Sequence, residues 1–123
     1  MGDSSRQGNM VKPSYTPSRG DLVWTDFNPQ TGREQAGKRP ALVLSPKIYN
    51  AKTGLAVMVP ITHQAKGYPF EVPIRTKAIN GVALSDHLKS LDWRMRGVTF
   101  AAKASAATLE KVTQNIAALI SLP

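Results

Sequence analysis

The stretch Glu34-Gln-Ala-Gly-Lys-Arg-Pro-Ala-Leu-Val-Leu-Ser-Pro46 is a polar loop that turns abruptly into an apolar strand. Arg39 lies at the junction. Pro40 restricts Arg39 to extended backbone and removes one backbone donor. The sequence therefore predicts a guanidinium at the mouth of a strand that runs to Ser45, a good position for binding phosphate. For an isolated Arg-Pro pair, a solvated basic loop before an ordinary core strand is the alternative.

Short apolar runs bounded by turn residues predict further strands on either side of this one. The expected strands are residues 22–27, 55–59 and 70–74. Pro73 favours an edge position for the last of these, and the continuous hydrophobicity of residues 55–59 favours a central one. Residues 50–54 are expected to form a turn. Residues 82–91 begin as an extended segment, and from residue 85 their pattern leaves helix and strand open.

The C-terminal segment has a different period. Leu109, Val112, Ile116, Leu119 and Ile120 recur at spacings of three and four residues, which predicts one apolar helix face. Ser105, just before this segment, is a plausible N-cap. Several short strands with one closing helix predict a mainly β fold with short helices, a small barrel closed by a C-terminal helix.

The organisation is that of a single domain. Residues 20–123 are long enough for one hydrophobic core and too short for two. Residues 1–19 are rich in Ser, Gly and Pro, which predicts a disordered leader whose opening could be an expression remnant. No apolar run is long enough to span a membrane and no signal peptide is apparent, so a cytoplasmic protein is expected.

The charge pattern suggests a polyanionic partner. The formal net charge is +8, and the whole excess lies between Arg33 and Lys103, where 12 basic residues face 4 acidic ones. A basic excess within the folded centre indicates a polyanion-binding surface, with a solubilising scatter of charge as the alternative. The chain has no cysteine and only two histidines, so neither a disulfide scaffold nor a zinc site is expected.

Common catalytic motifs are absent. The chain has no phosphate-binding loop ending in Gly-Lys-Ser/Thr, no Gly-x-Ser-x-Gly elbow and no His-Glu-x-x-His. What remains is Arg39 opening one strand and Thr62 closing a neighbouring one. If these two strands pair, both side chains would converge at one end of the sheet.

Five segments, taken in their order along the chain, resemble the MazF/PemK family of toxin endoribonucleases. They are Gly20-Asp-Leu-Val-Trp24, Glu34 to Pro46, Val59-Pro-Ile-Thr62, Lys66-Gly-Tyr-Pro-Phe-Glu71 and Gly81-Val-Ala-Leu84. The similarity extends to about residue 120. It implies an SH3-like barrel, a homodimer, and metal-independent, cofactor-free cleavage of single-stranded RNA at short sequences. It also implies an antitoxin partner of the MazE type with an acidic, flexible tail.

The resemblance carries three catalytic expectations. The arginine of the family's Arg-Pro motif falls on Arg39, and the threonine at the end of its third strand falls on Thr62. Cleavage by a 2′-hydroxyl needs a base, charge stabilisation at phosphorus and a proton for the leaving oxygen. Arg39 fits charge stabilisation, and Thr62 can donate a hydrogen bond. Glu34, where the family also has a glutamate, is the candidate base, with a solvated loop carboxylate as the alternative.

Residues expected to contact RNA combine cations with polar and flat side chains. They are Phe27, Asn28, Gln35, Lys38, His63, Lys66, Arg94 and, for phosphate, Arg96. Phe27 is the preferred stacking candidate, because Trp24 and Trp93 are expected in the core. The chain departs from the family at Arg33, where a small serine is common, and this adds a long cation to the rim.

Three alternatives stay open at this stage. His63 and His87 could supply an acid and a base, although neither falls on a catalytic position of the family. A gyrase-poisoning toxin on the same fold would act through an aromatic C-terminal tail, which the final residues Ala117 to Pro123 lack. A passive RNA-binding module would bind RNA in a salt-dependent manner and leave it intact.

Overall fold

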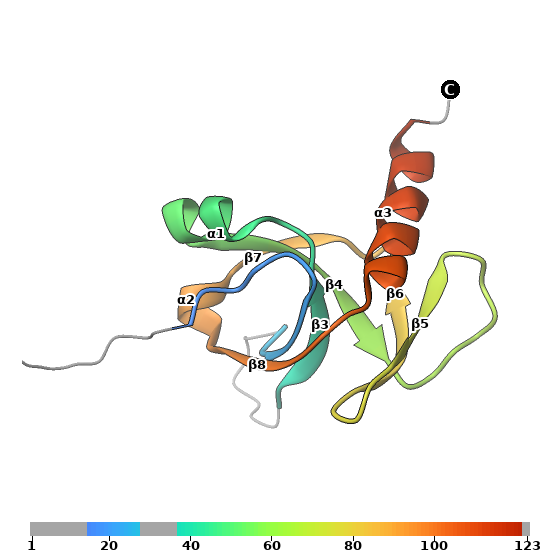
Figure 1. Ribbon diagram of the computed structural model, residues 1–123, viewed down its shortest axis with the longest axis horizontal. Helices are drawn as coiled ribbons and strands as arrows, with labels where there is room; N and C mark the ends of the chain where they lie inside the picture. The colour runs from blue at the N-terminus through green and yellow to red at the C-terminus, as the bar shows by residue number, and fades with distance from the viewer. Residues whose placement is uncertain (1–14, 28–36, 122–123) are drawn as a thin grey trace, which may run out of the picture.

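The computed structural model describes residues 15–27 and 37–121, and its centre is a strongly curved antiparallel sheet (Figure 1). The strands are β2 (Asp21–Thr25), β3 (Arg39–Val43), β4 (Leu55–Thr62), β5 (Glu71–Arg75), β6 (Asn80–Leu84), β7 (Lys89–Asp92) and β8 (Val98–Lys103). The helices are α1 (Lys47–Thr53), α2 (Trp93–Arg96) and α3 (Ala106–Ile120). The expectation of a mainly β domain with short helices and a C-terminal helix is confirmed.

The longest strand, β4, organises the sheet. One edge pairs with β3, so that Ala41 lies opposite Pro60. Along the other edge, β4 pairs first with β7 through Leu55–Met58 and then with β6 through Ile61 and Thr62. Because β4 changes neighbour along its length, the sheet bends around it. The central position expected for residues 55–59 is confirmed. β5 lies at the end of the strand order and carries the exposed Pro73, as predicted for an edge.

Two apolar clusters fill the two sides of the curved sheet. One joins β2, β3 and β4 to β5, β6 and α3, and has Leu22, Leu42 and Val59 at its centre. The other lies under β7 and α2 and includes Met58 and Trp93. Trp93 is 5% exposed and donates its indole N–H to the Asn50 carbonyl at 3.0 Å, which confirms the core position predicted for this tryptophan.

Helix α3 begins where the sequence predicted. The Ser105 hydroxyl accepts a hydrogen bond from the Thr108 N–H at 3.1 Å, which satisfies one of the unpaired donors of the first turn. Val112 is fully buried, and Leu109 and Ile116 pack against the first cluster. The apolar face is buried only in part, however, since Ile120 is 81% exposed.

One local expectation was wrong, and one open alternative is decided by the structure. The turn expected at residues 50–54 is the end of helix α1, which Gly54 terminates in the left-handed conformation at φ 76°. Helix α1 escapes pattern analysis because it lies on the surface and Ile48 is 69% exposed. The ambiguous residues 85–91 form a turn and then β7, and the only helical residues here begin at Trp93.

Residues 15–19, assigned to a disordered leader by composition, pack onto the domain. Pro17 is fully buried, and its carbonyl accepts a hydrogen bond of 2.8 Å from the buried Asn50 amide. The Tyr15 hydroxyl donates to the Asp21 carboxylate at 2.6 Å. The ordered domain therefore starts at or before Tyr15, while residues 1–14 lie outside the described part of the chain.

Candidate functional site

Arg39 and Thr62 line the same pocket, as their strand positions predict. The pocket has a volume of about 350 Å³ and lies where β3 begins and β4 ends. Its walls are Trp24, Gly37, Lys38, Arg39, Pro40, Ile61, Thr62 and His63. Arg39 is exposed, and none of the ion pairs among the described residues involves it. Its guanidinium therefore lies at the pocket without an ion-pair partner in the described part of the chain.

The strand register explains why the two side chains meet. Ala41 pairs with Pro60 in the β3–β4 ladder, so the same register continued by two residues sets Arg39 opposite Thr62. Directly opposite residues of antiparallel strands have Cβ atoms about 5 Å apart. On its other side Arg39 is paired with Thr25 of β2. Arg39 is therefore positioned by a regular sheet.

Backbone contacts also position Thr62. Its hydroxyl oxygen accepts the Gln64 N–H at 3.2 Å, which leaves the hydroxyl proton available for a ligand. Behind it, β6 approaches so closely that a Cβ added to Gly81 would lie 2.3 Å from the Thr62 carbonyl oxygen. A glycine at position 81 is thus needed for β6 to pair with the end of β4.

Helix α2 holds the two described ends of the chain that flank residues 28–36. The Arg96 guanidinium donates to the Asp26 and Phe27 carbonyls, at 3.0 Å each. The Lys38 ammonium donates to the Arg96 and Gly97 carbonyls, at 3.2 and 3.1 Å. Lys38 therefore lines the pocket and at the same time anchors the entry to β3. Arg96, predicted to bind phosphate, uses its side chain on the protein backbone.

One of the expected RNA contacts is contradicted, and another has a partner within the protein. Phe27 is 7% exposed in the second core cluster, with the Lys89 ammonium 5.7 Å from its ring centroid, so its face is not accessible for stacking. Arg94 donates to the Ala51 carbonyl and contacts Gly54, before β4 begins. Arg94 therefore lies near the start of β4, whereas Thr62 ends that strand.

The other predicted residues divide into two groups. His63 lines the pocket of Arg39, and Lys66 lines a second pocket on the other side of Thr62. His87 also lines that second pocket. Glu34, Asn28 and Gln35, together with Arg33, lie outside the described residues.

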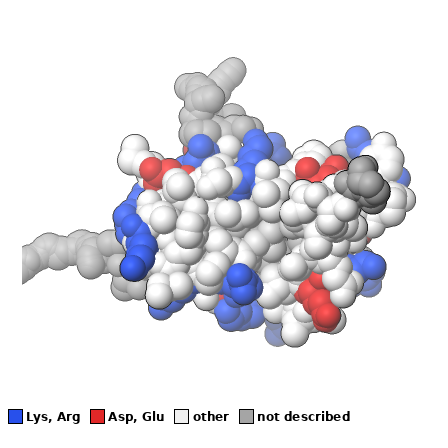
Figure 2. Space-filling model, turned by 90° about the horizontal axis from the view of Figure 1, so that it is seen from above, with Lys and Arg blue, Asp and Glu red and all other residues white. Residues whose placement is uncertain are grey.

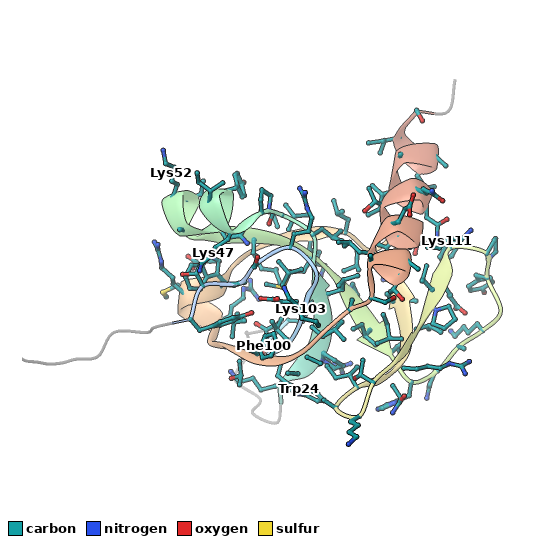
Figure 3. The ribbon with its side chains drawn as sticks, viewed as in Figure 1. Trp24, Lys47, Lys52, Phe100, Lys103 and Lys111 are labelled. Atoms are coloured by element: carbon teal, nitrogen blue, oxygen red, sulfur yellow. The ribbon has the colours of Figure 1, made fainter. Side chains whose placement is uncertain are left out.

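Trp24 was expected only in the core but also forms a wall of the Arg39 pocket. It is partly buried and packs against the first cluster. Figure 3 shows it at the lower margin of the sheet, on the side opposite α1 and Lys52. Its pairing with Pro40 in the β2–β3 ladder, next to Arg39, is the signal that could have identified it.

The clearest electrostatic perturbation lies away from these pockets. Partial burial, together with the hydrogen bond to the negatively charged Asp21, raises the pKa of Tyr15 far above its usual value of 10. Asp21 is also paired with Lys103 at 2.7 Å. Within the described ranges, no group of three His, Asp or Glu side chains is arranged to hold a metal ion, and no helix is long and apolar enough to cross a membrane.

A larger, apolar pocket of about 940 Å³ lies between α3 and the segment that leads into α1. Leu44, Pro46, Leu109 and Ile116 are among its lining residues. Figure 2, which views the molecule from above, shows a face that is mostly uncharged, with Lys and Arg toward its margins. Most of its lining side chains are apolar, although Arg19, Ser45 and Tyr49 also contribute, so its composition favours contact with another apolar surface.

Comparison with known proteins places these features in a family. Residues 18–120 match the model of the PemK-like, MazF-like toxin of type II toxin-antitoxin systems. The chain is 50% identical over 106 residues to the endoribonuclease toxin MazF of Escherichia coli K12, which covers 86% of this chain and 96% of that protein. It is 38% identical over 93 residues to the endoribonuclease toxin ChpB of the same organism, covering 71% and 78%.

Solved structures agree with the sequence comparison. The crystal structure of MazF from Deinococcus radiodurans matches with a TM-score of 0.79 and 48% identity, over 89% of this chain and all of that one. A MazE–MazF complex from the same organism matches with a TM-score of 0.79 and 43% identity over the same shares of the two chains. The chain therefore belongs to the PemK-like, MazF-like family of toxins of type II toxin–antitoxin systems.

Proposed function

We propose that this chain is a toxin endoribonuclease that cleaves single-stranded RNA at short sequences. The proposed reaction is attack of a 2′-hydroxyl on the neighbouring phosphorus, which leaves a 2′,3′-cyclic phosphate and a 5′-hydroxyl and uses no metal ion or cofactor. The observation that carries the proposal is the convergence of Arg39 and Thr62 in one pocket. The relatives named endoribonuclease, at up to 50% identity, support it.

Arg39 and Thr62 have separate proposed roles. A guanidinium fork can bind two phosphate oxygens and stabilises the charge that accumulates as phosphorus becomes pentacoordinate. The Thr62 hydroxyl, which already accepts one backbone N–H, can donate to a third oxygen. Because Arg39 is paired with Thr25 and Thr62 with Val82, little reorganisation is needed when charge develops.

Arg39 is a poor candidate for the base, since a guanidinium is almost never neutral near pH 7. We assign the role of base to Glu34. Because Glu34 lies outside the described residues, this assignment rests on the resemblance alone. If bound RNA covers this carboxylate, the loss of contact with water would raise the pKa of the carboxylate from about 4.3 toward neutrality.

The proposed partners follow from the neighbouring structures and from the surface. MazE–MazF complexes among the structural relatives support an antitoxin of the MazE type. An acidic segment would be attracted to the basic excess of this chain. We also propose a homodimer, supported by the apolar pocket beside α3 and by Leu119 and Ile120, which are 48% and 81% exposed. The proposed compartment is the cytoplasm, consistent with a chain without cysteine.

The proposal is tested by incubating the purified protein with a mixed-sequence single-stranded RNA in EDTA and mapping the ends produced. Wild-type protein should yield 2′,3′-cyclic phosphate ends. Arg39→Ala should lower kcat by about 10² to 10³-fold, the usual cost of removing one such donor. Arg39→Lys keeps the charge but not the fork and should recover only part of this loss.

Lys52→Ala is the matched control, because it removes an exposed cation from α1, near the opposite end of β4, and should cleave like wild type. RNA that stays intact with wild-type protein would refute the proposed activity. Full cleavage by Arg39→Ala would refute the proposed role of the arginine.

A further inference from the structure

A second pocket adjoins the first, with Thr62 as a wall of both. It has a volume of about 330 Å³. Its other lining residues are Gln64, Lys66, Tyr68, Phe70, Glu71, Leu84, Asp86 and His87. If the scissile phosphate lies at Arg39 and Thr62, a ligand group in this pocket belongs to a nucleotide next to the cleaved bond. The inference below therefore rests on the proposed function.

Aromatic side chains form part of the wall. The rings of Tyr68 and Phe70 are stacked, with centroids 5.4 Å apart and an interplanar angle of 28°. Tyr68 is 52% exposed, so it is covered by the protein only in part. Proteins that bind single-stranded RNA stack its splayed-out bases on accessible aromatic rings that lie close to the groups that bind phosphate.

The loop that carries these rings is held in place before any ligand binds. The Glu71 carboxylate accepts the Lys66 and Gly67 N–H groups at 3.0–3.1 Å, and Gly67 adopts a positive φ of 85°. The Phe70 carbonyl accepts the Ser85 N–H, at 3.3 Å. Since the loop is already folded, a bound base would not have to order it.

The part of the pocket wall that carries Asp86 is also fixed. Ser85 is 1% exposed, and its hydroxyl accepts a hydrogen bond from the Asn115 amide of α3 at 3.2 Å. The following residue, Asp86, has a side chain that is 27% exposed, and the nearest ring nitrogen of His87 is 3.8 Å from its carboxylate. At that distance the pair does not form a hydrogen bond. Among the described residues the carboxylate therefore keeps its capacity to accept.

The chemistry of the rim favours some bases over others. A carboxylate only accepts hydrogen bonds, so it matches the exocyclic amino group of adenine, cytosine or guanine. Uracil has no amino group, and its two carbonyl oxygens lie on either side of its single N–H. A carboxylate that faces this edge of uracil is repelled by the partial negative charges of the two carbonyl oxygens.

We infer that this second pocket binds one unstacked nucleobase next to the cleaved bond, and that Asp86 selects a base with an exocyclic amino group over uracil. In this arrangement Tyr68 provides the stacking surface. Arg39 and Thr62 define where the phosphate lies, and Asp86 defines which base can occupy the adjoining position.

The test compares wild type with Asp86→Asn on single-stranded RNAs that differ in one base at each position around the cleaved bond. Binding is measured on 2′-O-methyl versions, which lack the attacking hydroxyl, and cleavage on unmodified RNA. Wild type should disfavour uracil at one position by about 10-fold or more. An asparagine both donates and accepts, so Asp86→Asn should bring uracil there to within about 3-fold of the amino-bearing bases, with other positions unchanged.

Asp92→Asn is the matched control, since it removes the same charge from a residue whose carboxylate caps α2 by accepting the Met95 N–H. It should keep the wild-type profile. Tyr68→Leu should weaken binding about 10-fold for all four bases without altering their order.

The result that would overturn the inference is an unchanged base profile in Asp86→Asn, or wild-type binding that is equal for uracil and the amino-bearing bases at every position. Binding with the expected selectivity but no cleavage would instead refute the proposed nuclease activity and leave the base pocket supported.

Discussion

At the scale of single residues, the site depends on backbone packing as much as on its reactive groups. Gly81 has no functional group, yet it sets the position of Thr62, because β6 passes so close to the Thr62 carbonyl that no side chain fits between them. Arg39 is likewise held by its pairing with Thr25 of β2. Under the proposed function, the geometry of the site therefore depends on the backbone packing around Arg39 and Thr62.

Gly81→Ala should therefore impair catalysis through Thr62. The added Cβ would lie 2.3 Å from the Thr62 carbonyl oxygen, so the strand must shift. We expect a loss of about 1–3 kcal/mol in the free energy of unfolding and a fall in kcat on the order of 10²-fold, because a displacement of about 1 Å can cost that much. Chemical denaturation and single-turnover cleavage measure the two effects.

Gly20→Ala separates displacement from general destabilisation. Gly20 also has a positive φ, of 93°, but a Cβ there would meet only Leu109, at 3.7 Å. This variant should lose about 1–2 kcal/mol of stability and keep the wild-type kcat. Equal activity losses in the two glycine variants would contradict the positioning role of Gly81.

Tyr15 should make stability depend on pH in the alkaline range. Its pKa is raised in the folded protein, so the stabilisation is fully present below the unfolded value of about 10 and is lost as pH rises beyond it. Tyr15→Phe removes the hydrogen bond to Asp21 and should lower the free energy of unfolding by about 1–3 kcal/mol at pH 8.

The difference in unfolding free energy between wild type and Tyr15→Phe should stay constant from pH 8 to about 10 and then shrink. Urea denaturation at a series of pH values measures it. A difference that grows above pH 10 would show that the hydroxyl is not held in its neutral form.

At the scale of elements, α2 is the anchor beside the site. This helix of four residues binds Asp26 and Phe27 through the Arg96 side chain, and Lys38 through the Arg96 and Gly97 carbonyls. Both described ends of the chain around residues 28–36 are thus held on one short helix. The chain entering β3, and with it Arg39, depends on an element that lies more than fifty residues later in the sequence.

Arg96→Met should show this dependence. It removes two charge-assisted hydrogen bonds to backbone carbonyls and should cost about 2–4 kcal/mol of stability together with a clear loss of RNA cleavage. Arg94→Met is the matched control, because Arg94 is exposed and donates to one carbonyl of α1, far from Thr62. Thermal unfolding and cleavage rates that are the same for both variants would argue against α2 as an anchor.

The elements also show what pattern analysis can and cannot predict. The strands at residues 22–27, 40–45 and 55–59 and the N-cap at Ser105 carry local signals, and the structure confirms them to within a few residues. Helix α1 was missed because its apolar side chains are exposed and its fully buried residue is the polar Asn50, which bonds to Pro17 and Ser45. Such tertiary hydrogen bonds leave no periodic trace in sequence.

At the scale of the whole molecule, the excess of positive charge should govern RNA affinity. For single-stranded nucleic acid, the slope of log affinity against log salt is about −0.7 per phosphate contacted. Four contacts would give a slope near −3, or about a 50-fold loss of affinity between 50 and 200 mM salt. Fluorescence anisotropy with a 2′-O-methyl RNA measures the slope, which Arg39→Ala should reduce by about 0.7 and Lys52→Ala should not change.

A slope close to zero would mean that the central basic excess serves solubility only.

At this scale, only part of the candidate site could be predicted from the sequence. Arg39 and Thr62 could be placed together because the start of a strand lies beside the end of its antiparallel neighbour. The burial of Phe27 and the distance of Arg94 from the site depend on how the sheet curves, and no short segment encodes that curvature.

The pairing of β2 with β8 has a consequence for the timing of synthesis. Strand β2 lies near the start of the described chain, but its partner β8 begins at Val98. Once Thr62 has been added, roughly 40 further residues must be made before β8 is complete, which takes roughly 2 to 8 s at typical translation rates of about 5–20 residues per second. A toxin built in this order has its proposed phosphate-binding residues, Arg39 and Thr62, on the ribosome for seconds before the sheet that supports them can close.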